Sequence, residues 1–563
     1  MDIPRKHWII APPLPAEADL ALNSYPPIIR QILFNRGFST LEAASDFLEA
    51  RLPSGTDPFL LKGMEVAVDR IRRAISKQEK VAIYGDYDVD GVTATALLVE
   101  TLEELGADVL GYIPNRFDEG YGLNCEALNH LSEQGVRLVI TVDCGIRSDP
   151  EVAHANKIGL DVIVTDHHHP HQELPPALAI INPKQPGDQY AHKDLAGVGL
   201  AYKLATALSG PAQGTEAFLD LVALGTVADL APLAGENRAL VRQGIELIRR
   251  PQRQGLMALM GASGMLPAKL TASHIGFVLG PRLNAAGRLD SALMALMLLR
   301  TRDVNRAAEL AQHLDNQNRE RQKITLQIQK QAEQIALARD PDPYLLFAAH
   351  PDFNAGVVGL AASKLVETYY RPAIVAHQGE GFVRGSCRSI PEFHITQALD
   401  QCAELIEHHG GHAAAAGFTV REENLPILIE RLSEIALQQL AQIDLRHKLQ
   451  ADVQLPLKEL RPDLLQHLNR LQPTGYGNRQ AYFVSRNLKV TSSRKVGRDE
   501  NHLRLTVTDG HITYDAIAFG LGNWYDQMPG KIDLFYSFEL NEYNGRTSLQ
   551  LNVRDLKPSG EKD

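Results

Sequence analysis

Three aspartates stand at alternate positions directly after an apolar run, in the segment KVAIYGDYDVDG of residues 80–91. They are Asp86, Asp88 and Asp90. Carboxylates this close repel one another unless a cation or strong hydrogen-bond donors lie among them. The residue types and their spacing therefore predict a metal site in which these side chains are ligands.

Two alternatives compete with a metal site. A carboxylate cluster in a surface loop is often only solvated, and D-x-D-x-D-G also opens the calcium loop of an EF-hand. An EF-hand needs a bidentate Glu at its twelfth position, where this chain has Leu97 in an apolar stretch. The flanking sequence argues against a merely solvated loop. VAIY has the pattern of a buried strand, and VTATALLVETLEELG that of an amphipathic helix ending at Gly106.

The same arrangement recurs twice along the chain. RLVITVDCG ends an apolar run at Asp143, and LDVIVTDHHHP ends another at Asp166, His167 and His168. Helix-like stretches at 123–134 and 149–158 precede these runs. Alternating strands and helices at this spacing predict an α/β fold with a doubly wound parallel sheet. Because parallel strands present their carboxyl ends at one edge, where ligands bind, we expect these side chains to lie together.

A fourth acidic residue, Asp229, stands in the mostly apolar stretch FLDLVALGTVADLAPL of residues 218–233. An unpaired buried carboxylate costs several kcal/mol, so this residue is expected to meet a cation or strong donors. A helix-capping or turn aspartate is the alternative. Beside the other three segments, a role as ligand is favoured.

Oxygen ligands combined with imidazole suit Mn²⁺ or Mg²⁺ better than Zn²⁺. So many carboxylates exceed the needs of one ion, which favours a two-metal centre that clamps the attacking and leaving oxygens of a phosphoryl displacement. Asp143 is best placed to bridge, whereas Asp86 and Asp166 are either ligands or residues that orient histidine and water. The expected metal ligands are Asp88, Asp90, Asp143, His167 and Asp229, and the expected catalytic residues are His168, Asp86 and Asp166.

Length and composition bound the kind of protein. A chain of 563 residues is too long for one core. Its net charge of −11 is not that of a typical nucleic-acid-binding protein, although residues 282–323 and 486–498 are locally basic. Either basic stretch could equally be a solvated face.

Four Cys without paired spacing argue against disulfides and a cysteine zinc site. The start MDIPRKHWII lacks the apolar region of a signal peptide, and no run suits a membrane span, so we expect a cytoplasmic monomer.

The chain divides by pattern into five parts. From Arg288 to Asp340 there is no Gly or Pro, and residues 303–339 are helical in composition, which predicts a long connecting helix. A smaller α/β lobe follows, with helices at 356–370 and 394–408 and strands between them. Five alternating segments near the end predict a β-barrel of the OB-fold type. The expected domains are a helical cap (1–55), the metal-binding lobe (56–250), a helical connector (251–340), the smaller lobe (341–445) and the barrel (450–557).

The motifs resemble a known family. GDYDVDG, VDCG, TDHH and GTVAD, in that order, are similar to the four motifs of the DHH phosphoesterases. GPRLNAAGRLD, RGSCRSI and GGHAAAAGF resemble more specifically its RecJ branch of single-strand-specific DNA exonucleases, and the resemblance covers most of the chain. It implies 5′→3′ hydrolysis of single-stranded DNA with two divalent ions, Mn²⁺ or Mg²⁺, in recombination and repair. It also implies a DHH-associated domain in the smaller lobe, and a helicase and a single-strand-binding protein as candidate partners.

Ser386 and Arg388 form S-x-R on a strand-like segment, so both side chains face one side and can bracket a phosphate. Members of the branch usually have glycine where Cys387 stands. Arg116 resembles a residue of a 5′-end pocket, with a salt bridge as the alternative. For Asn284 the alternative role is in a turn at the start of a helix. For His412 the alternative role is helix capping or core packing. The expected phosphate-binding residues are Arg116, Arg282, Asn284, Ser386, Arg388 and His412.

The resemblance implies that His168 donates to a phosphate oxygen while an activated water attacks phosphorus. In the barrel, several aromatic residues are candidates for base stacking, and at least half of them are expected to be core. They are Tyr514, Phe519, Trp524, Tyr536 and Tyr543. Rival functions are a DHH oligoribonuclease, another phosphoesterase of the family, or a non-catalytic DNA-binding scaffold. The pyrophosphatase branch has a histidine where Tyr84 stands, and scaffolds lose ligands that this chain keeps.

Overall fold

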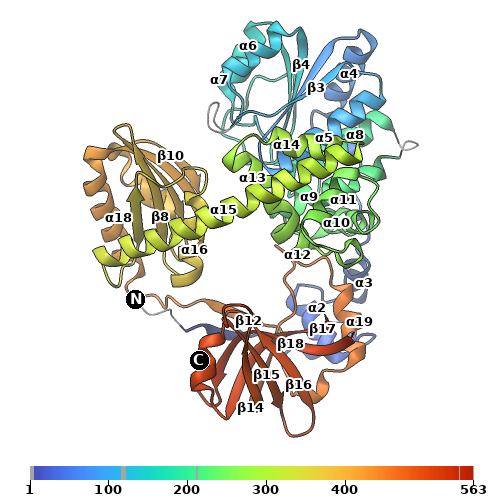
Figure 1. The fold of residues 1–563 in the computed structure, drawn as a ribbon. Coiled ribbons are helices and arrows are strands. Elements are labelled where there is room, and N and C mark those ends of the chain that lie inside the picture. The colour runs from blue at the N-terminus through green and yellow to red at the C-terminus, as the bar shows by residue number, and fades with distance from the viewer. Residues whose placement is uncertain (1–4, 116–121, 211–213, 544–545, 562–563) are drawn as a thin grey trace. The chain divides into compact units, whose positions relative to one another are not determined.

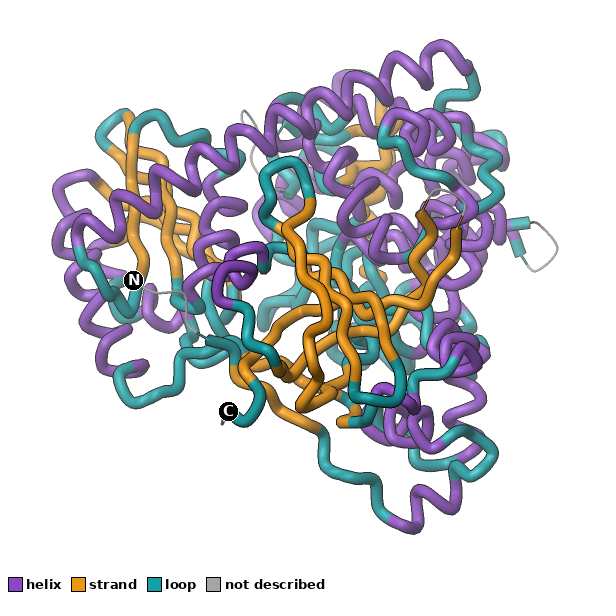
Figure 2. Tube along the Cα trace, turned by 60° about the horizontal axis from the view of Figure 1, so that its bottom comes forward, coloured by secondary structure: helices purple, strands orange, loops and turns teal. Residues whose placement is uncertain are grey.

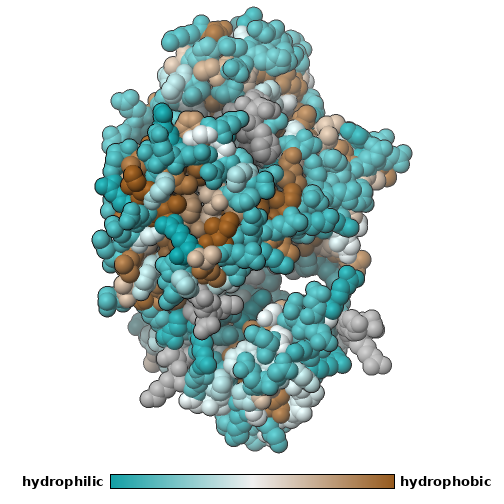
Figure 3. All heavy atoms as spheres, turned by 60° about the vertical axis from the view of Figure 1, so that its left-hand side comes forward, coloured by the Kyte–Doolittle hydropathy of each residue, from teal (hydrophilic) through white to brown (hydrophobic). Residues whose placement is uncertain are grey.

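A computed structural model describes residues 5–115, 122–210, 214–543 and 546–561, which form two compact units (Figure 1). The larger unit contains residues 12–318 and 452–554, and the smaller unit contains residues 1–11, 319–451 and 555–563. None of the helices in the described part of the chain combines the length and the apolar character needed to cross a membrane. The face drawn in Figure 3 is mostly hydrophilic, with hydrophobic side chains gathered in a few places.

The larger unit is built around a parallel sheet with the strand order β3-β2-β4-β5-β6. The chain runs from β2 outward to β3 and returns on the other side of β2 as β4, so the order reverses between β2 and β4. Ligands bind outside the carboxyl ends of the strands at such a point. The strands are β2 (Lys80–Gly85), β3 (Val109–Tyr112), β4 (Val136–Val142), β5 (Asp161–Thr165) and β6 (Ala179–Ile181).

Helices cover both faces of this sheet, which confirms the predicted doubly wound fold. Helices α6 (Cys125–Glu133) and α7 (Asp149–Lys157) lie on one face, and α4 (Met64–Ser76) and α8 (Gly197–Ser209) on the other. Because side chains alternate along a strand, β2 contributes Ala82 and Tyr84 to one apolar cluster and Val81 and Ile83 to the other. The strands are therefore apolar on both sides, as their sequences predict.

Two buried helices lead to the edge where the strands end. Helix α5 (Val89–Glu104) begins after Asp88, whose Oδ1 accepts hydrogen bonds from the backbone N–H of Asp90 (2.8 Å) and of Gly91 (3.1 Å). This is an N-cap arrangement. Helix α9 (Leu219–Ala228) ends at Asp229. Both helices are buried over most of their length and so behave as packed rods inside the unit.

The predicted long helix is confirmed as α15 (Val304–Arg339), 36 residues without interruption. The boundary between the two units falls inside it, between Asn318 and Arg319. The helices that come before it in the larger unit are α10 (Gly235–Ile248), α11 (Gln254–Ala262), α12 (Ala272–His274), α13 (Gly280–Leu289) and α14 (Leu293–Arg300).

The predicted C-terminal barrel is also confirmed. Its strands follow the order β13-β14-β15-β16-β18-β17, and a further pairing of β14 with β17 closes it (Figure 2). Helix α19 (Pro462–Arg470) precedes the five long strands. The strands are β13 (Val453–Gln454), β14 (Phe483–Val496), β15 (His502–Thr508), β16 (Thr513–Ala518), β17 (Lys531–Tyr543) and β18 (Arg546–Pro558).

Arg238 of α10 joins the barrel to the rest of the larger unit. Its guanidinium is buried and stacks on Phe47, with 4.0 Å between the guanidinium carbon and the ring centroid. It donates hydrogen bonds of 2.9–3.1 Å to five backbone carbonyls, those of Phe47, Arg470, Leu471, Gln472 and Pro473. The segment that leads into the barrel is thereby held to α10, because leaving these buried carbonyls unpaired would be costly.

The N-terminal segment is not purely helical. Helices α1 (Ala16–Ala21), α2 (Pro27–Asn35) and α3 (Leu41–Glu49) form as expected, but His7–Ile10 is a strand, β1. It pairs in parallel with β12 (Lys448–Ala451), inside the smaller unit. A four-residue strand whose partner lies this far along the chain gives no local sequence signal.

The smaller unit has a sheet in the order β10-β11-β9-β8-β7, packed against α16 (Val358–Tyr369) and α18 (Leu425–Leu440). The helix predicted at 394–408 is shorter, because α17 covers only Ile395–Asp400 and a strand starts at Ile406. That strand pairs its glycines with β11, which a local helical pattern does not reveal. The strands are β7 (Leu346–His350), β8 (Ala373–Gly379), β9 (Phe382–Arg388), β10 (Ile406–His412) and β11 (Ala415–Arg421).

Candidate metal centre

The residues predicted as ligands gather at the carboxyl edge of the parallel sheet. Three groups of side chains have ligand atoms that all lie within 4.8 Å of one another. Asp143 and His167 each belong to two of these groups, so the groups form one continuous cluster. The groups are Asp86, Asp88 and Asp143; Asp143, His167 and His168; and Asp90, His167 and Asp229.

The centre of the cluster is the imidazole of His167. Its Nε2 lies 3.1 Å from Asp143 Oδ1, 3.6 Å from Asp229 Oδ2 and 3.9 Å from Asp90 Oδ2. Both His167 Nε2 and Asp143 Oδ1 are buried and have no hydrogen-bond partner among the described residues. Buried polar atoms without partners are costly, so the geometry fits cations that these atoms would ligate. The donor set of carboxylates with one or two imidazoles suits Mn²⁺ or Mg²⁺.

The backbone holds two of the carboxylates in place. The carboxylate of Asp90 accepts hydrogen bonds from the N–H groups of Gly197 (2.6 Å) and Val198 (2.8 Å), at the N-terminus of α8. Asp143 has a left-handed φ of 62°, a conformation that few non-glycine residues adopt and that often marks functional positions. Its backbone N–H is fixed by the carbonyl of Thr165 at 3.1 Å.

Unlike the other carboxylates, Asp166 belongs to none of the three groups of candidate ligands found among the described residues. Its Oδ2 accepts from the backbone N–H of Ile146 (3.0 Å), and its Oδ1 accepts from the N–H of His168 (3.0 Å) and lies 2.7 Å from His168 Nδ1. Burial opposes ionisation of this carboxyl, but these bonds and the charge of His168 lower its pKa below the usual range. Of the two roles left open by the sequence, this arrangement favours orientation of the imidazole over ligation.

Two residues that the sequence did not single out hold the histidine segment. Asn182 Nδ2 donates to the carbonyl of His168 at 2.9 Å, and Lys184 Nζ donates to the carbonyl of His167 at 2.7 Å. Both follow β6, the next strand of the sheet. Their position just after a strand in the segment INPKQPG was the available signal.

Close approach of helices to the cluster depends on two glycines. A Cβ at Gly197 would lie 2.7 Å from Asp143 Cβ and 3.0 Å from Asp90 Oδ2. A Cβ at Gly225 of α9 would lie 2.8 Å from Asp90 Oδ1 and 2.7 Å from Val198 Cγ1. Any larger side chain at either position would therefore push against the ligands themselves.

Burial and mutual repulsion dominate the electrostatics of the clustered carboxylates. Burial, and after it the negative charges of neighbouring carboxylates, raise the pKa of Asp90 to about 7 and that of Asp229 to about 9. The same causes raise the pKa of Asp143 well above its usual range. Burial and the neighbouring His168 lower the pKa of His167 to about 3, so this imidazole is neutral and able to ligate a cation.

These shifts predict how pH affects the metal-free protein. The carboxyls of Asp90 and Asp229 have pKa values of about 7 and about 9 when folded, against about 4 in an unfolded chain. The folded state thus holds protons that the unfolded chain releases, and stability is lost as pH rises through these folded values. His167 is largely neutral in both states above about pH 7 and does not oppose this trend.

We therefore expect the Tm in EDTA to fall between about pH 7 and about pH 9, and the rise in Tm caused by Mn²⁺ to grow over the same range. Asp229→Asn should flatten the fall in EDTA. Thermal denaturation followed by circular dichroism measures both. A Tm in EDTA that is constant or rises with pH would contradict these shifts.

Two of the predicted phosphate-binding residues in the larger unit contact protein groups. Arg282 Nε donates to the buried carboxylate of Asp315 (2.9 Å), and its Nη1 donates to the carbonyl of Val278 (2.8 Å). Asn284 Oδ1 accepts from the N–H of Val89 at 3.1 Å, so it supports the first turn of α5 beside Asp88. Asn284 lies inside helix α13 and not in a turn. Arg116 lies outside the described residues.

In the smaller unit, Ser386 and Arg388 lie on β9 with their side chains together, and Arg388 Nη1 donates to Ser386 Oγ at 3.1 Å. A Cβ at Gly359, in the first turn of α16, would lie 2.8 Å from Ser386 Oγ and 2.9 Å from Arg388 Nη2. Gly359 therefore lets the start of α16 pack directly against both groups. A hydroxyl, a guanidinium and a helix N-terminus lie together here, a combination that suits a phosphate. Cys387 between them is buried, and His412 lies exposed on β10, so it does not pack in a core.

Four of the five aromatic residues named for the barrel have described side chains, and two of these four are buried. Tyr514 and Tyr536 are buried, and Tyr536 OH lies 2.7 Å from Ser485 Oγ, so both belong to the core. Phe519 is 57% exposed, and Trp524 is half-buried. The side chain of Tyr543 lies outside the described part.

Comparison with known proteins gives matches over most of the chain. The model of the DHH family, N-terminal domain, matches residues 80–226, that of the DHHA1 domain residues 342–438, and that of the RecJ OB domain residues 451–555. A Bacillus subtilis protein named single-stranded-DNA-specific exonuclease RecJ is 41% identical over 537 residues, which cover 95% of this chain and 68% of that protein. The Escherichia coli protein of the same name is 36% identical over 561 residues, 95% of this chain and 96% of that protein.

A solved structure agrees with these matches. The crystal structure of RecJ in complex with Mn²⁺ from Thermus thermophilus is similar with a TM-score of 0.84 and 29% identity, over 99% of this chain and 80% of that one. Related structures contain Mg²⁺ or manganese. The residues of the cluster fit these ions by the chemistry of their donor atoms.

Proposed function

Since the chain belongs to the RecJ family of single-stranded-DNA-specific exonucleases, we propose a two-metal mechanism for its hydrolysis of single-stranded DNA from the 5′ end. The protein is a nuclease with Mn²⁺ or Mg²⁺ as cofactor. The observation that carries the mechanism is the cluster around His167 Nε2 and Asp143 Oδ1, two buried atoms without hydrogen-bond partners in the described structure. A non-catalytic scaffold is not favoured, because the full set of acidic and imidazole groups meets at one edge.

We assign Asp88, Asp90, Asp143, His167 and Asp229 as the residues that would hold the divalent ions, and Asp143, which belongs to two of the three groups, is best placed to contact both. The proximity of Asp86 to Asp88 and Asp143 supports a further carboxylate ligand there. When bound, divalent ions supply an activated water for attack on phosphorus and neutralise charge on the phosphate. The left-handed backbone of Asp143 and the N–H groups at the start of α8 hold the ligands before any ion enters.

His168 is proposed to stabilise the negative charge that develops on the phosphate. Asp166 lies 2.7 Å from its Nδ1 and so fixes the orientation of the ring, and Nε2 is the nitrogen proposed to donate to a phosphate oxygen. Burial lowers the pKa of His168, but the bond to Asp166 and the charge of that carboxylate raise it above the usual range overall. Protonated imidazole donates a stronger, charge-assisted hydrogen bond.

Other parts of the chain are proposed to hold the strand. In the smaller unit, Ser386 and Arg388 would bind a phosphate beside the start of α16, which Gly359 allows to pack against both side chains. Arg116 is proposed to contact the 5′ end, and His412 a phosphate. In the barrel, the exposed ring of Phe519 is proposed to stack on a base. Since the substrate is single-stranded, we propose that a helicase and a single-strand-binding protein present it.

Digestion of end-labelled oligonucleotides tests this function. With Mn²⁺, single-stranded DNA should release mononucleotides from the 5′ end, whereas blunt duplex DNA and RNA of the same sequence should be far poorer substrates. An oligonucleotide blocked at its 5′ end should resist digestion, and one blocked at its 3′ end should not. Efficient attack on the 5′-blocked strand would contradict the proposed polarity, and equal cleavage of RNA would favour the oligoribonuclease alternative.

A further inference from the structure

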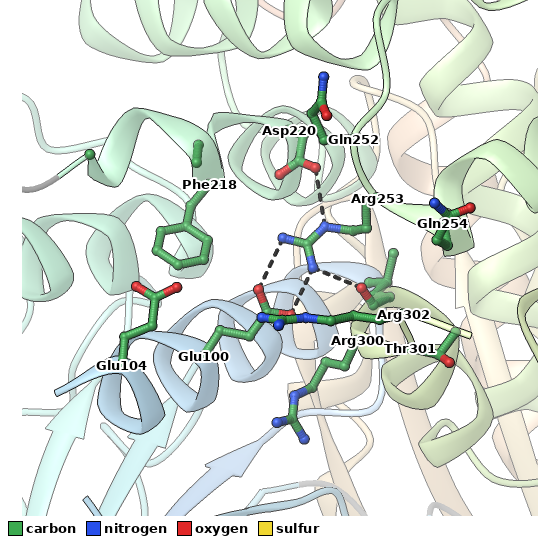
Figure 4. A pocket seen from close by; sticks show the side chains of 13 residues that line it. Glu100, Glu104, Phe218, Asp220, Gln252, Arg253, Gln254, Arg300, Thr301 and Arg302 are labelled. Carbon is green, nitrogen blue, oxygen red and sulfur yellow. Dashed lines mark hydrogen bonds and ion pairs between the residues drawn. The ribbon is translucent and has the colours of Figure 1, made fainter. Parts of the chain in front are cut away.

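A cavity of about 440 Å³ lies in the larger unit at the ends of α5 and α9 that are remote from the metal centre (Figure 4). Glu100 and Glu104 of α5 line it, together with Phe218 and Asp220 at the start of α9. Arg253, just before α11, lies in its wall between the two helices. The cavity therefore adjoins the same two helices that carry metal-centre residues at their other ends.

Arg253 joins these two helix ends directly. Its Nη1 lies 2.7 Å from Glu100 Oε1 and its Nη2 lies 3.2 Å from Oε2, so one carboxylate is held by both nitrogens. Its Nε lies 3.1 Å from Asp220 Oδ2, and Nη1 also donates to the carbonyl of Leu299 at 2.8 Å. Figure 4 shows the guanidinium between the two carboxylates. A lysine has no planar fork that could make this set of contacts.

The three side chains are largely shielded from water. Their exposed fractions are 13% for Arg253, 19% for Glu100 and 11% for Asp220. Partly buried ion pairs are screened less than surface pairs, and removal of one partner leaves the other charges uncompensated. This contact therefore resists sliding of α5 against α9 more than an ordinary surface salt bridge would.

Each of the two helices is a short rod packed in the core. A displacement of the end near Arg253 would therefore move the other end, at the metal centre. About 18 Å of helix separates Glu100 from Asp88, and about 14 Å separates Asp220 from Asp229. Between these ends, Gly225 brings α9 so close to α5 that a Cβ there would collide with Thr93 and with Asp90. A shift of either helix along its axis therefore changes the spacing of Asp90 and Asp229 around His167.

We propose that Arg253 is a positioning residue for the metal centre: by joining Glu100 to Asp220 it fixes α5 against α9, and with them the ligands at their opposite ends. The inference rests on the proposed role of Asp90 and Asp229 as metal ligands. Residues hydrogen-bonded directly to metal ligands change metal affinity by about 10–100-fold when they are replaced, and for Arg253, which acts through two helices, we expect the low end of that range.

The test is the Kd for Mn²⁺ of the full chain without DNA, measured by isothermal titration calorimetry at a temperature where circular dichroism shows a folded protein. Arg253→Met should bind Mn²⁺ about tenfold more weakly than wild type. The matched control is Arg300→Met. Arg300 lines the same cavity and pairs with Glu103 of α5 at 2.6 Å, and within the described part of the chain its ion pair is with α5 and not with α9. This control should bind Mn²⁺ like wild type.

A second variant keeps the test decisive if Arg253→Met does not fold. Glu100→Gln removes the ion pair on the α5 side and leaves that between Arg253 and Asp220, and it should weaken Mn²⁺ binding in the same direction by a smaller factor. The Kd for single-stranded DNA in EDTA should not change in any variant. Wild-type Mn²⁺ affinity in the folded variants, or an equal loss in Arg300→Met, would overturn the inference. Failure of wild type itself to bind Mn²⁺ would instead overturn the metal centre on which the inference rests.

Discussion

Replacement of Asp143 by alanine is expected to reduce Mn²⁺-dependent cleavage of single-stranded DNA by about a hundredfold or more, while strand binding stays largely intact. Asp143 belongs to two of the three groups of candidate ligands. Its Oδ1 is buried, faces His167 Nε2 at 3.1 Å and has no hydrogen-bond partner in the described structure. Loss of this carboxylate therefore removes the atom best placed to be shared between two ions.

Initial rates of nucleotide release, compared with the Kd for a labelled oligonucleotide in EDTA, separate catalysis from binding. Asp108→Ala is a suitable control, because Asp108 is an exposed aspartate just before β3 and is not one of the clustered ligands. That variant should keep wild-type rates. Cleavage by Asp143→Ala at more than a few per cent of the wild-type rate would count against a shared-metal role.

Gly225→Ala is expected to have the second-largest effect, although it adds a single methyl group. In α9 this Cβ would collide with Thr93 Oγ1 and lie 2.8 Å from Asp90 Oδ1 and 2.7 Å from Val198 Cγ1. The helix is buried, so it has no free side toward which to move. Overpacking of this kind costs about 1–3 kcal/mol of stability, and here the strain falls on a proposed ligand.

We therefore expect Gly225→Ala to lower both the Tm and the affinity for Mn²⁺, the latter by about tenfold or more. Gly261→Ala is the matched control. Gly261 lies in helix α11 and has nothing within 4 Å of its added Cβ, so the substitution should leave Mn²⁺ affinity unchanged and slightly favour the helix. Equal Mn²⁺ affinities of the two variants would show that the close packing at Gly225 does not position Asp90.

The sequence was sufficient for the part of the site that follows strand ends. Asp143 and Asp166 each come directly after an apolar run, and strand direction alone places such residues at one edge of a parallel sheet. Asp229 was identifiable because a carboxylate in an apolar stretch needs a partner. The parallel strands could be predicted from their apolar runs, the long helix from a stretch without Gly or Pro, and the barrel from its alternating segments.

The rest of the site and of the fold depends on contacts between residues that are distant in sequence. The N–H groups of Gly197 and Val198 that hold Asp90 come from the backbone, which leaves no side-chain signal. Arg282 could be recognised as part of a motif, but its hydrogen bond to Asp315 could not be predicted from the sequence. The pairing of β1 with β12 and the ion pairs of Arg253 with Glu100 and Asp220 likewise join segments that no local sequence pattern relates.

The proposed mechanism requires that two divalent ions bind between the clustered carboxylates and His167. Anomalous diffraction from crystals of the protein soaked in Mn²⁺ would locate such ions. We expect two peaks per chain, with Asp143 contacting both and with Asp88, Asp90, His167 and Asp229 among the surrounding ligands. No ion at this edge of the sheet, or a single ion that Asp143 does not touch, would contradict the proposed mechanism.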